Sequence, residues 1–261
     1  MDISVIIPTY KAAKYLPVLL PSLKKQTLCA KEIIVIDSSS SDETVALAAA
    51  EGCITEVIPQ SSFRHGGTRN RATQRASGEV LVFMTQDAQP YDEYFLERLV
   101  QPIAAGGCAA AYARQVPYPN ASPLEVFARK FNYPAQSHHR TIQDLSRLGI
   151  KTYFFSNVAS AVRATAFKEV DRFPESVILN EDMLLCAKLL RAGYPIAYQA
   201  DAIVYHSHSY TLVQQFKRYF DIGVFMLQAD DWLRGGASSG EGLRYVREQT
   251  RYLVRQGAWS Q

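Results

Sequence analysis

The chain has 261 residues, of which 48% are hydrophobic and 20% are charged, and its formal net charge is +3. This size and composition suit one large α/β domain or two closely packed halves, and they argue against a disordered or low-complexity chain. Because the small positive charge is scattered along the sequence, no nucleic acid partner is expected.

The N-terminus and the cysteines both favour a cytoplasmic protein. Asp2 is followed directly by an apolar run and Pro8, without the positive start and small-residue cleavage site of a secretory signal. No apolar run approaches the roughly 18 to 20 residues that span a bilayer. The four cysteines lie far apart and form no CxxC or Cys/His cluster, so we expect neither a structural zinc site nor a disulfide framework.

Three apolar runs in the first part of the chain predict buried strands. Residues 4–7 and 32–36 are continuous β-branched runs, and residues 80–84 form a third. Between them, residues 15–26 and 41–51 favour helices, the second with Ser41 or Asp42 as its N-cap and Gly52 as its stop. The alternation of strand and helix implies a parallel sheet.

The pattern changes after about residue 110. Residues 116–134 are rich in Pro, Tyr and Phe, and residues 136–147 are polar, so we expect loops and short helices there. Residues 153–166, 180–192 and 196–205 restore strand and helix patterns, and residues 212–227 favour a further helix.

Ligands of open parallel sheets bind outside the carboxyl ends of the strands, so the segments that follow the three runs are the first candidates for chemistry. They are residues 8–11, 37–42 and 85–90. Asp37 could accept hydrogen bonds from a base or a ribose, and the serine-rich turn after it leads into a helix start that can hold phosphate. A capped turn without a ligand is the alternative.

Asp87 is placed by the same argument at the same edge of the sheet. A single carboxylate, with substrate phosphate oxygens completing the shell, is a common way to hold Mg²⁺ or Mn²⁺. A turn aspartate before Pro90 is the alternative. Between the two segments, the sequence FRHGGTRNR at residues 63–71 combines a glycine pair, which permits close backbone approach, with three arginines suited to phosphate.

Two later motifs add a carboxylate pair and a histidine pair. Glu181 and Asp182 open a predicted helix, where they either complement the helix dipole or include a general base near an acceptor hydroxyl. His206 and His208 follow the predicted strand 196–205. One of these imidazoles, with His206 slightly favoured, could reach the crevice as a ligand of a metal or a diphosphate.

Together these motifs resemble those of the family 2 glycosyltransferases, inverting enzymes with a GT-A fold, and within them most closely those of bacterial rhamnosyltransferases. The match covers residues 3–225 and rests on VIIPTY at 5–10, VIDSSSSDET at 35–44, FRHGGTRNRA at 63–72, TQDAQP at 85–90, NED at 180–182 and YHSHSYT at 205–211. The resemblance implies an α/β fold with a Rossmann-like, mostly parallel central sheet flanked by helices. It also implies a nucleotide-sugar-binding half at 1–110, an acceptor-binding and catalytic half at 111–211 and a C-terminal helical segment at 212–261.

The resemblance implies roles for individual residues. The donor would be bound by Pro8, Thr9, Tyr10, Asp37, Ser39, Arg69, Asn70, Gln86 and Asp87. Asp87, at the metal position of the family's DxD motif, and His206 would hold Mg²⁺ or Mn²⁺, whereas Glu181, His208 and Arg218 would contact the acceptor or the diphosphate. Gln86 departs from the motif, because an acidic residue is common there, and this implies weaker metal binding.

The implied reaction transfers rhamnose from dTDP-rhamnose to a saccharide or lipid-linked saccharide in bacterial cell-surface polysaccharide synthesis. Asp182 would act as general base while the acceptor oxygen attacks the anomeric carbon opposite the diphosphate, which inverts it in one displacement. A UDP-hexose donor is the first alternative. The others are a non-catalytic nucleotide-sugar-binding scaffold and a nucleotidyltransferase, which would need a glycine-rich loop where residues 8–13 have no glycine.

The C-terminal part suggests contact with a membrane. The sequence QFKRY at 215–219 is similar to the QxxRW motif of processive synthases, but no transmembrane helix accompanies it, which implies transfer of one or a few sugars. At about 100° per residue, one helical stripe is basic and its neighbour apolar. The stripes are Arg244, Arg247, Arg251 and Arg255, and Leu243, Val246, Leu253 and Val254. Such a helix suits the anionic cytoplasmic face of the inner membrane, and a helix packed on the domain is the alternative.

Overall fold

The computed structural model describes residues 1–208, 210–235 and 239–257. Ser209, from the YHSHSYT motif, and residues 236–238 and 258–261, from the predicted C-terminal segment, lie outside the described residues. The strands are β1 (Ile3–Thr9), β2 (Glu32–Asp37), β3 (Ile54–Val57), β4 (Val80–Met84), β5 (Gln89–Pro90), β6 (Ala110–Val116), β7 (His138–Arg140), β8 (Ala159–Arg163) and β9 (Ile196–Tyr205).

The helices lie between these strands and after them. They are α1 (Leu16–Lys24), α2 (Thr44–Ala50), α3 (His65–Thr73), α4 (Phe95–Ala104), α5 (Pro123–Asn132), α6 (Leu145–Leu148), α7 (Ala164–Glu169), α8 (Glu181–Arg191), α9 (Leu212–Gln228), α10 (Asp230–Leu233) and α11 (Ser239–Arg255). Short 3-10 turns cover Gln60–Ser62, Ile142–Asp144 and Gly149–Tyr153.

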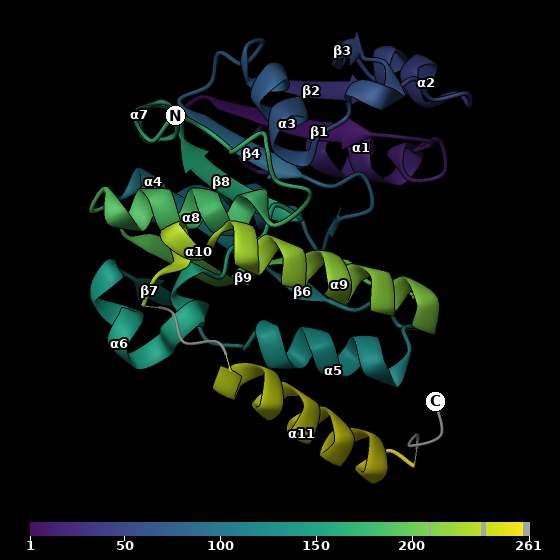
Figure 1. Cartoon of the computed structure of the whole chain (residues 1–261). Helices are drawn as coiled ribbons and strands as arrows, with labels where there is room; N and C mark the ends of the chain where they lie inside the picture. Colours follow the sequence, from purple (N-terminus) through teal and green to yellow (C-terminus); the bar gives the residue numbers. More distant parts are fainter. Residues whose placement is uncertain (209, 236–238, 258–261) are drawn as a thin grey trace.

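All the strands belong to one sheet, in the order β3-β2-β1-β4-β8-β6-β9-β5, with β7 paired to β9 (Figure 1). Strands β3, β2, β1 and β4 are parallel, as are β6 and β9. Strand β8 lies antiparallel between β4 and β6, and it joins the two parallel groups. The predicted α/β architecture, a mostly parallel sheet flanked by helices, is confirmed.

The central strands are buried on both faces, which is why their sequences are continuous apolar runs. Ile6, Ile34 and Phe83 pack in one core with Leu185 of α8. The residues next to them along the strands, Val5, Val35 and Val82 among them, pack in a second core with the apolar faces of α1 and α4. The sheet therefore separates two hydrophobic cores, and the loops at its carboxyl edge are left for chemistry.

Some predicted boundaries were wrong. Helix α2 begins at Thr44 and has Glu43 at its N-cap, whereas Ser41 or Asp42 was expected; Asp42 instead accepts a hydrogen bond from the Thr44 backbone at 3.2 Å. The region after residue 110 is also more regular than expected. Strand β6 is alanine-rich and lacks a β-branched run, so its sequence gives no strand signal.

The C-terminal helices pack on the second half of the sheet and on α5. Phe127 of α5 lies against the rings of Tyr245 and Tyr252 in α11, with ring centroids 5.3 and 5.5 Å apart. None of the helices within the described part of the chain is both long enough and apolar enough to cross a bilayer.

Helix α3 approaches the loop before α8 most closely at Gly66. A β-carbon added there would lie 2.1 Å from the carbonyl oxygen of Pro174, whereas one added at Gly67 would lie 3.5 Å from its nearest neighbour. We predict that Gly66→Ala lowers the free energy of unfolding by about 2 kcal/mol, because helix and loop must move apart. Gly67→Ala is the matched control and should not destabilise the protein. Urea denaturation of both variants measures this, and equal losses would contradict the close contact.

Candidate active site

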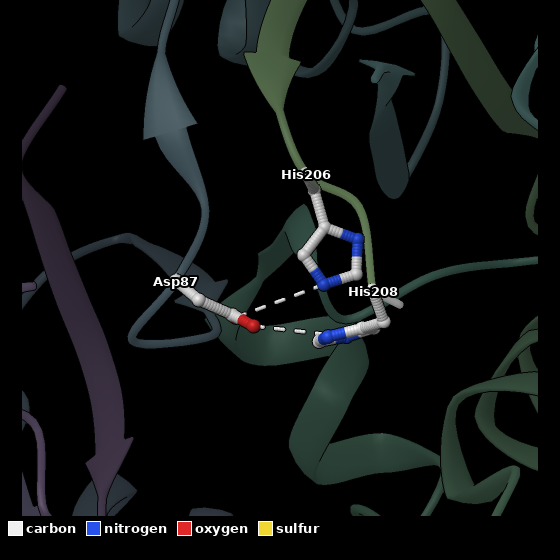
Figure 2. A group of neighbouring side chains, drawn as sticks. All are labelled: Asp87, His206 and His208. Atoms are coloured by element: carbon white, nitrogen blue, oxygen red, sulfur yellow. Dashed lines mark ion pairs between the residues drawn. The ribbon is translucent and has the colours of Figure 1, made fainter. Parts of the chain in front are cut away.

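The carboxyl ends of β1, β2 and β4 lie side by side, because these strands are parallel neighbours in the sheet. Thr9 and Asp37 are direct partners in the ladder between β1 and β2. The segment after β9 reaches the same edge, since His206 and His208 lie beside Asp87 (Figure 2). Residues far apart in sequence are thus brought together at one edge.

Asp37 ties the loops after β1 and β2 together. Its Oδ1 accepts hydrogen bonds from the hydroxyls of Thr9 at 2.9 Å and Ser40 at 2.6 Å, and its Oδ2 accepts one from the Ser40 backbone at 2.7 Å. Ser39 has a positive φ of 56°, and its hydroxyl donates to the carbonyl of Ile58 at 2.8 Å. The buried carboxylate of Asp37 therefore shapes the turn that follows β2. Through its bond to Thr9, it also lies next to the loop that carries the exposed Tyr10.

Gln86 holds this loop from the other side. Its Oε1 accepts a hydrogen bond from the Tyr10 backbone N–H at 2.8 Å, and its Nε2 donates to the Tyr10 carbonyl at 3.1 Å. A carboxylate could make the first of these bonds but not the second, because it has no proton to donate. The departure from an acidic residue at this position thus has a structural account, since only an amide can bind both groups of the Tyr10 backbone.

Asp87, His206 and His208 form a cluster that could hold a metal ion (Figure 2). The Nε2 atom of His206 lies 3.7 Å from Oδ1 of Asp87, and Nε2 of His208 lies 3.6 Å from Oδ2. One ligand atom from each residue lies within 4.8 Å of the others. The predicted metal residues Asp87 and His206 are therefore neighbours, and His208, predicted to contact acceptor or diphosphate, joins them.

The orientation of His206 is set by a residue that the sequence did not single out. Nδ1 of His206 lies 2.9 Å from Oε1 of Gln115, which can only accept a hydrogen bond. Gln115 is itself oriented by its Nε2, which donates to the hydroxyls of Tyr133 at 2.5 Å and Ser156 at 2.9 Å. Nη2 of Arg129, which can only donate, lies farther from the same Nδ1 atom, at 3.3 Å. Because the contact with Gln115 is the shorter one, we assign the proton of His206 to Nδ1, so that the lone pair of Nε2 faces Asp87.

The charge state of the histidines agrees with this arrangement. Burial, with the positive charge of Arg129 nearby, lowers the pKa of His206 well below its usual value. Burial also lowers the pKa of His208, although the carboxylate of Asp87 opposes the shift. Both imidazoles are therefore neutral near neutral pH, which is the form that binds metal ions.

Glu181 and Asp182 open α8, and Asn157 contacts both. The buried Glu181 forms an ion pair with Arg69 of α3 at 3.2 Å and accepts a hydrogen bond from the side-chain amide of Asn157 at 3.0 Å. The backbone N–H of Asn157 donates to Oδ2 of Asp182 at 3.0 Å, and that of Met183 donates to Oδ1 at 2.8 Å. Asp182 is thereby held in one orientation at the start of the helix.

The surroundings of Asp182 raise the pKa of its carboxyl group. Burial, and next the negative charge of Glu181, raise the pKa of Asp182 to about 7, while the N–H groups of Asn157 and Met183 and the charge of Arg69 oppose the shift. A carboxylate whose pKa lies near the working pH can accept a proton and still be ionised much of the time.

One cleft of about 750 Å³ connects the cluster of Asp87, His206 and His208 with the carboxylates of Glu181 and Asp182. It is lined by Asp87, His206, His208, Arg69, Glu181 and Asp182, and by residues of α5 and α9 that include Arg218. The Nε atom of Arg69 is buried and has no hydrogen-bond partner among the described residues. A smaller cavity of about 200 Å³ lies next to it, beside Gln86 and Asp87.

Asn70, predicted to bind the donor, does not line this cleft. Its amide donates to the Phe173 carbonyl and to the Glu175 carboxylate, both at 2.9 Å, so it holds α3 against the loop before α8. His138 and His139 lie on β7, which pairs with β9 away from the cluster at its carboxyl end. Pro8 and Thr9 end strand β1 at the adjoining edge of the sheet, and Tyr10 and Ser39 lie in the loops joined by Asp37.

Gln115, Asn157 and Arg129 are the residues of the site that the sequence did not single out. Arg129 donates to the carbonyl of His206 at 2.9 Å and forms an ion pair with Glu125. None of the three belongs to a charged or glycine-rich motif. The position of Gln115 near the end of β6 was the one available signal, and β6 itself was not predicted.

The comparisons with known proteins agree with the predicted resemblance. The family model described as glycosyl transferase family 2 matches residues 4–171. The O-antigen chain rhamnosyltransferase RfbN of Salmonella typhimurium is 43% identical over 259 residues, which are 98% of this chain and 82% of that protein. The O-antigen chain rhamnosyltransferase WbaN of Salmonella anatum is 40% identical over 257 residues, 97% of this chain and 81% of that protein.

Solved structures share the fold at lower identity. TarS 1-349 of S. aureus in complex with UDP-GlcNAc has a TM-score of 0.64 at 19% identity, covering 98% of this chain and 73% of that one. The mannosyltransferase PcManGT of Pyrobaculum calidifontis, in complex with GDP-Man and Mn2+, also has a TM-score of 0.64, at 17% identity, covering 99% and 84%. The predicted GT-A type fold is confirmed.

The two hydrogen bonds from Gln86 to Tyr10 generate a prediction about nucleotide-sugar binding. Gln86→Glu should weaken binding by about tenfold, because the new carboxylate faces the Tyr10 carbonyl without a proton and displaces the loop. Gln89→Glu adds the same charge three residues along and should have a much smaller effect. Calorimetric titration with a nucleoside diphosphate sugar compares them, and equal losses would attribute the effect to charge alone.

Proposed function

Because the chain belongs to glycosyl transferase family 2 and is therefore a glycosyltransferase, we propose that it transfers rhamnose from dTDP-rhamnose, with inversion, to a saccharide or lipid-linked saccharide acceptor. The observation that carries the proposal is the presence in one cleft of Asp182, whose pKa is near 7, and of the cluster of Asp87, His206 and His208. A base and a site for the leaving diphosphate are the two parts that a single displacement needs.

The donor assignment is supported by the two relatives whose names are O-antigen chain rhamnosyltransferases. The nucleoside would lie against the loops after β1 and β2, where Tyr10 is exposed and Asp37 and Gln86 hold the backbone. The buried guanidinium of Arg69 has an unused Nε donor, which suits a phosphate or carbonyl oxygen of the donor. A UDP-hexose is the alternative donor, and the UDP-GlcNAc complex of a structural neighbour keeps it open.

Asp87, His206 and His208 fit a divalent metal ion in number, spacing and chemistry. One carboxylate and two neutral imidazoles leave room for phosphate oxygens in the shell. Mg²⁺ prefers oxygen ligands throughout, so the two nitrogens favour Mn²⁺ over Mg²⁺. A bound ion would supply positive charge to the leaving diphosphate.

Asp182 would remove the proton from the acceptor hydroxyl as its oxygen attacks the anomeric carbon. The N–H groups of Asn157 and Met183 keep the carboxylate in place, and burial together with the neighbouring charge of Glu181 keeps it basic. The bond to the diphosphate breaks as the new glycosidic bond forms on the opposite face of the sugar, so no covalent intermediate with the enzyme arises. Arg218, which lines the cleft from α9, would bind the diphosphate or the acceptor.

We place this reaction in the synthesis of a bacterial cell-surface polysaccharide, at the cytoplasmic face of the inner membrane. The naming of the relatives for the O-antigen chain supports this setting. The lipid of a lipid-linked acceptor would lie in the bilayer, so the enzyme would work in peripheral contact with the membrane.

The base assignment predicts both a variant and a pH profile. Asp182→Asn should lower kcat by about a thousandfold and leave donor binding intact, because the amide cannot take a proton. In the wild type, kcat/KM should fall about tenfold per pH unit below pH 7, since the carboxylate that acts as base becomes protonated there. Full activity of Asp182→Asn, or a profile that stays flat down to pH 5, would remove the assignment.

The donor and metal assignments predict the outcome of a calorimetric titration with dTDP-rhamnose and with UDP- and GDP-sugars. Binding of dTDP-rhamnose should be strongest, should be tighter with Mn²⁺ than with Mg²⁺, and should weaken at least about tenfold with a chelator or in His206→Ala. His139→Ala, which removes a histidine from outside the cluster, is the control. Preference for a UDP-sugar would select the alternative donor, and no binding of any sugar nucleotide would favour a non-catalytic scaffold.

A further inference from the structure

Helix α9 packs into the core near its C-terminal end through Phe225, but a second apolar stripe of the helix faces away from the protein. Its polar residues Gln214, Arg218 and Asp221, spaced i, i+4 and i+7, line the cleft. Val213, Phe216, Phe220 and Leu227 share a stripe on the other side of the helix, and they are 64%, 72%, 64% and 83% exposed. In a globular protein such a stripe normally faces the core. An exposed one of this size marks an interaction surface.

Helix α11 repeats this arrangement. It packs on Phe127 of α5 through Tyr245 and Tyr252, and its opposite side leaves Leu243, Val246 and Val254 at least 57% exposed. The predicted basic and apolar stripes thus lie side by side on α11, and the apolar stripe faces away from the protein. Both helices lie in the lower part of the molecule in Figure 1, with α5 between them in that view. Each also lines the cleft, through Tyr219 and Tyr245.

The charges beside these stripes are positive. Arg244 and Arg251 pair with Glu241 and Glu248 of their own helix, at 3.3 and 3.0 Å. Within the ranges that the structure describes, Arg247 and Arg255 have no acidic partner, and both are exposed. On α9, Lys217 is exposed next to Phe216.

We infer that the apolar stripe of α9 (Val213, Phe216, Phe220 and Leu227) and the arginine-bordered stripe of α11 dock on an anionic lipid bilayer. Aromatic and aliphatic side chains would enter the interface, and the arginines would meet the lipid phosphates. A symmetric contact with a second copy fits less well, because a twofold interface would place the same positively charged patch on both of its sides. The surface lies beside the cleft, so docking would present the site to a lipid-linked acceptor; this last step alone rests on the proposed function.

The test is co-sedimentation of the intact chain with vesicles of phosphatidylcholine and phosphatidylglycerol in equal amounts, compared with phosphatidylcholine alone. The wild type should bind the mixed vesicles, and Phe216→Ser/Phe220→Ser should reduce the partition coefficient by about tenfold or more. Ile54→Ser/Val57→Ser, which removes two exposed apolar side chains from β3, should bind like the wild type. Arg247→Gln/Arg255→Gln keeps both apolar stripes. Its binding to mixed vesicles should fall toward the level that the wild type shows on phosphatidylcholine alone.

Two further measurements separate the outcomes. Circular dichroism and donor titration should be unchanged in Phe216→Ser/Phe220→Ser, because these side chains touch neither core nor cleft. The inference is overturned if the wild type ignores mixed vesicles, if the double phenylalanine variant binds as well as the wild type, or if sedimentation velocity finds a dimer that this variant dissociates. Vesicle binding without sugar-nucleotide binding would support the docking surface and count against the proposed function only.

Discussion

The buried ion pair between Arg69 and Glu181 joins α3 to the start of α8, and the position of Asp182, the proposed general base, depends on it. The two residues are 112 positions apart in sequence, and each is about 5% exposed or less. Removing one partner of such a pair typically costs about 3–5 kcal/mol, because the other charge is left buried and unpaired. The pair fixes the start of α8 against α3, and Asn157 transmits this position to Asp182 through its backbone and side-chain amides.

Burial raises the pKa of Asp182, and the negative charge of Glu181, which also holds the helix, raises it further. The charge of Glu181 is itself balanced by Arg69 and by the amide of Asn157. The structural ion pair and the raised pKa of the proposed base are therefore parts of one arrangement. The glycine at position 66, where α3 meets the 173–174 loop without space for a side chain, allows the close approach on which it relies.

Hydrogen bonds from uncharged side chains orient the proposed metal cluster of Asp87, His206 and His208. The amide of Gln115 links His206 to Tyr133 and Ser156, so the imidazole has one orientation before any ligand binds. On the other side, Gln86 holds the Tyr10 backbone at the carboxyl edge of the sheet. The cleft is thus preorganised by amide side chains, which can donate and accept at once, where carboxylates could only accept.

The sequence by itself determined the parallel strands and the positions of the acidic and histidine motifs. Buried parallel strands leave continuous apolar runs, so β1, β2 and β4 were predictable. The predicted strands at 80–84 and 196–205 match β4 and β9 to the residue. Because such strands end at one edge, the convergence of Asp37 and Asp87 also followed. The alanine-rich β6 and the amide partners Gln115 and Asn157 did not, since they carry no periodic or charged signal. Strand β8 was expected only within the broader strand and helix pattern of residues 153–166.

Only the tertiary structure decided which of these residues meet and which faces stay exposed. The pairing of Arg69 with Glu181, and of Asp87 with both histidines, joins segments separated by about a hundred residues, and no local pattern encodes such a distance. Helical periodicity likewise predicts an apolar stripe on α11 but cannot tell whether it packs inward. The packing of Phe127 against Tyr245 and Tyr252 turns that stripe outward, because the two tyrosines meet an aromatic partner on α5.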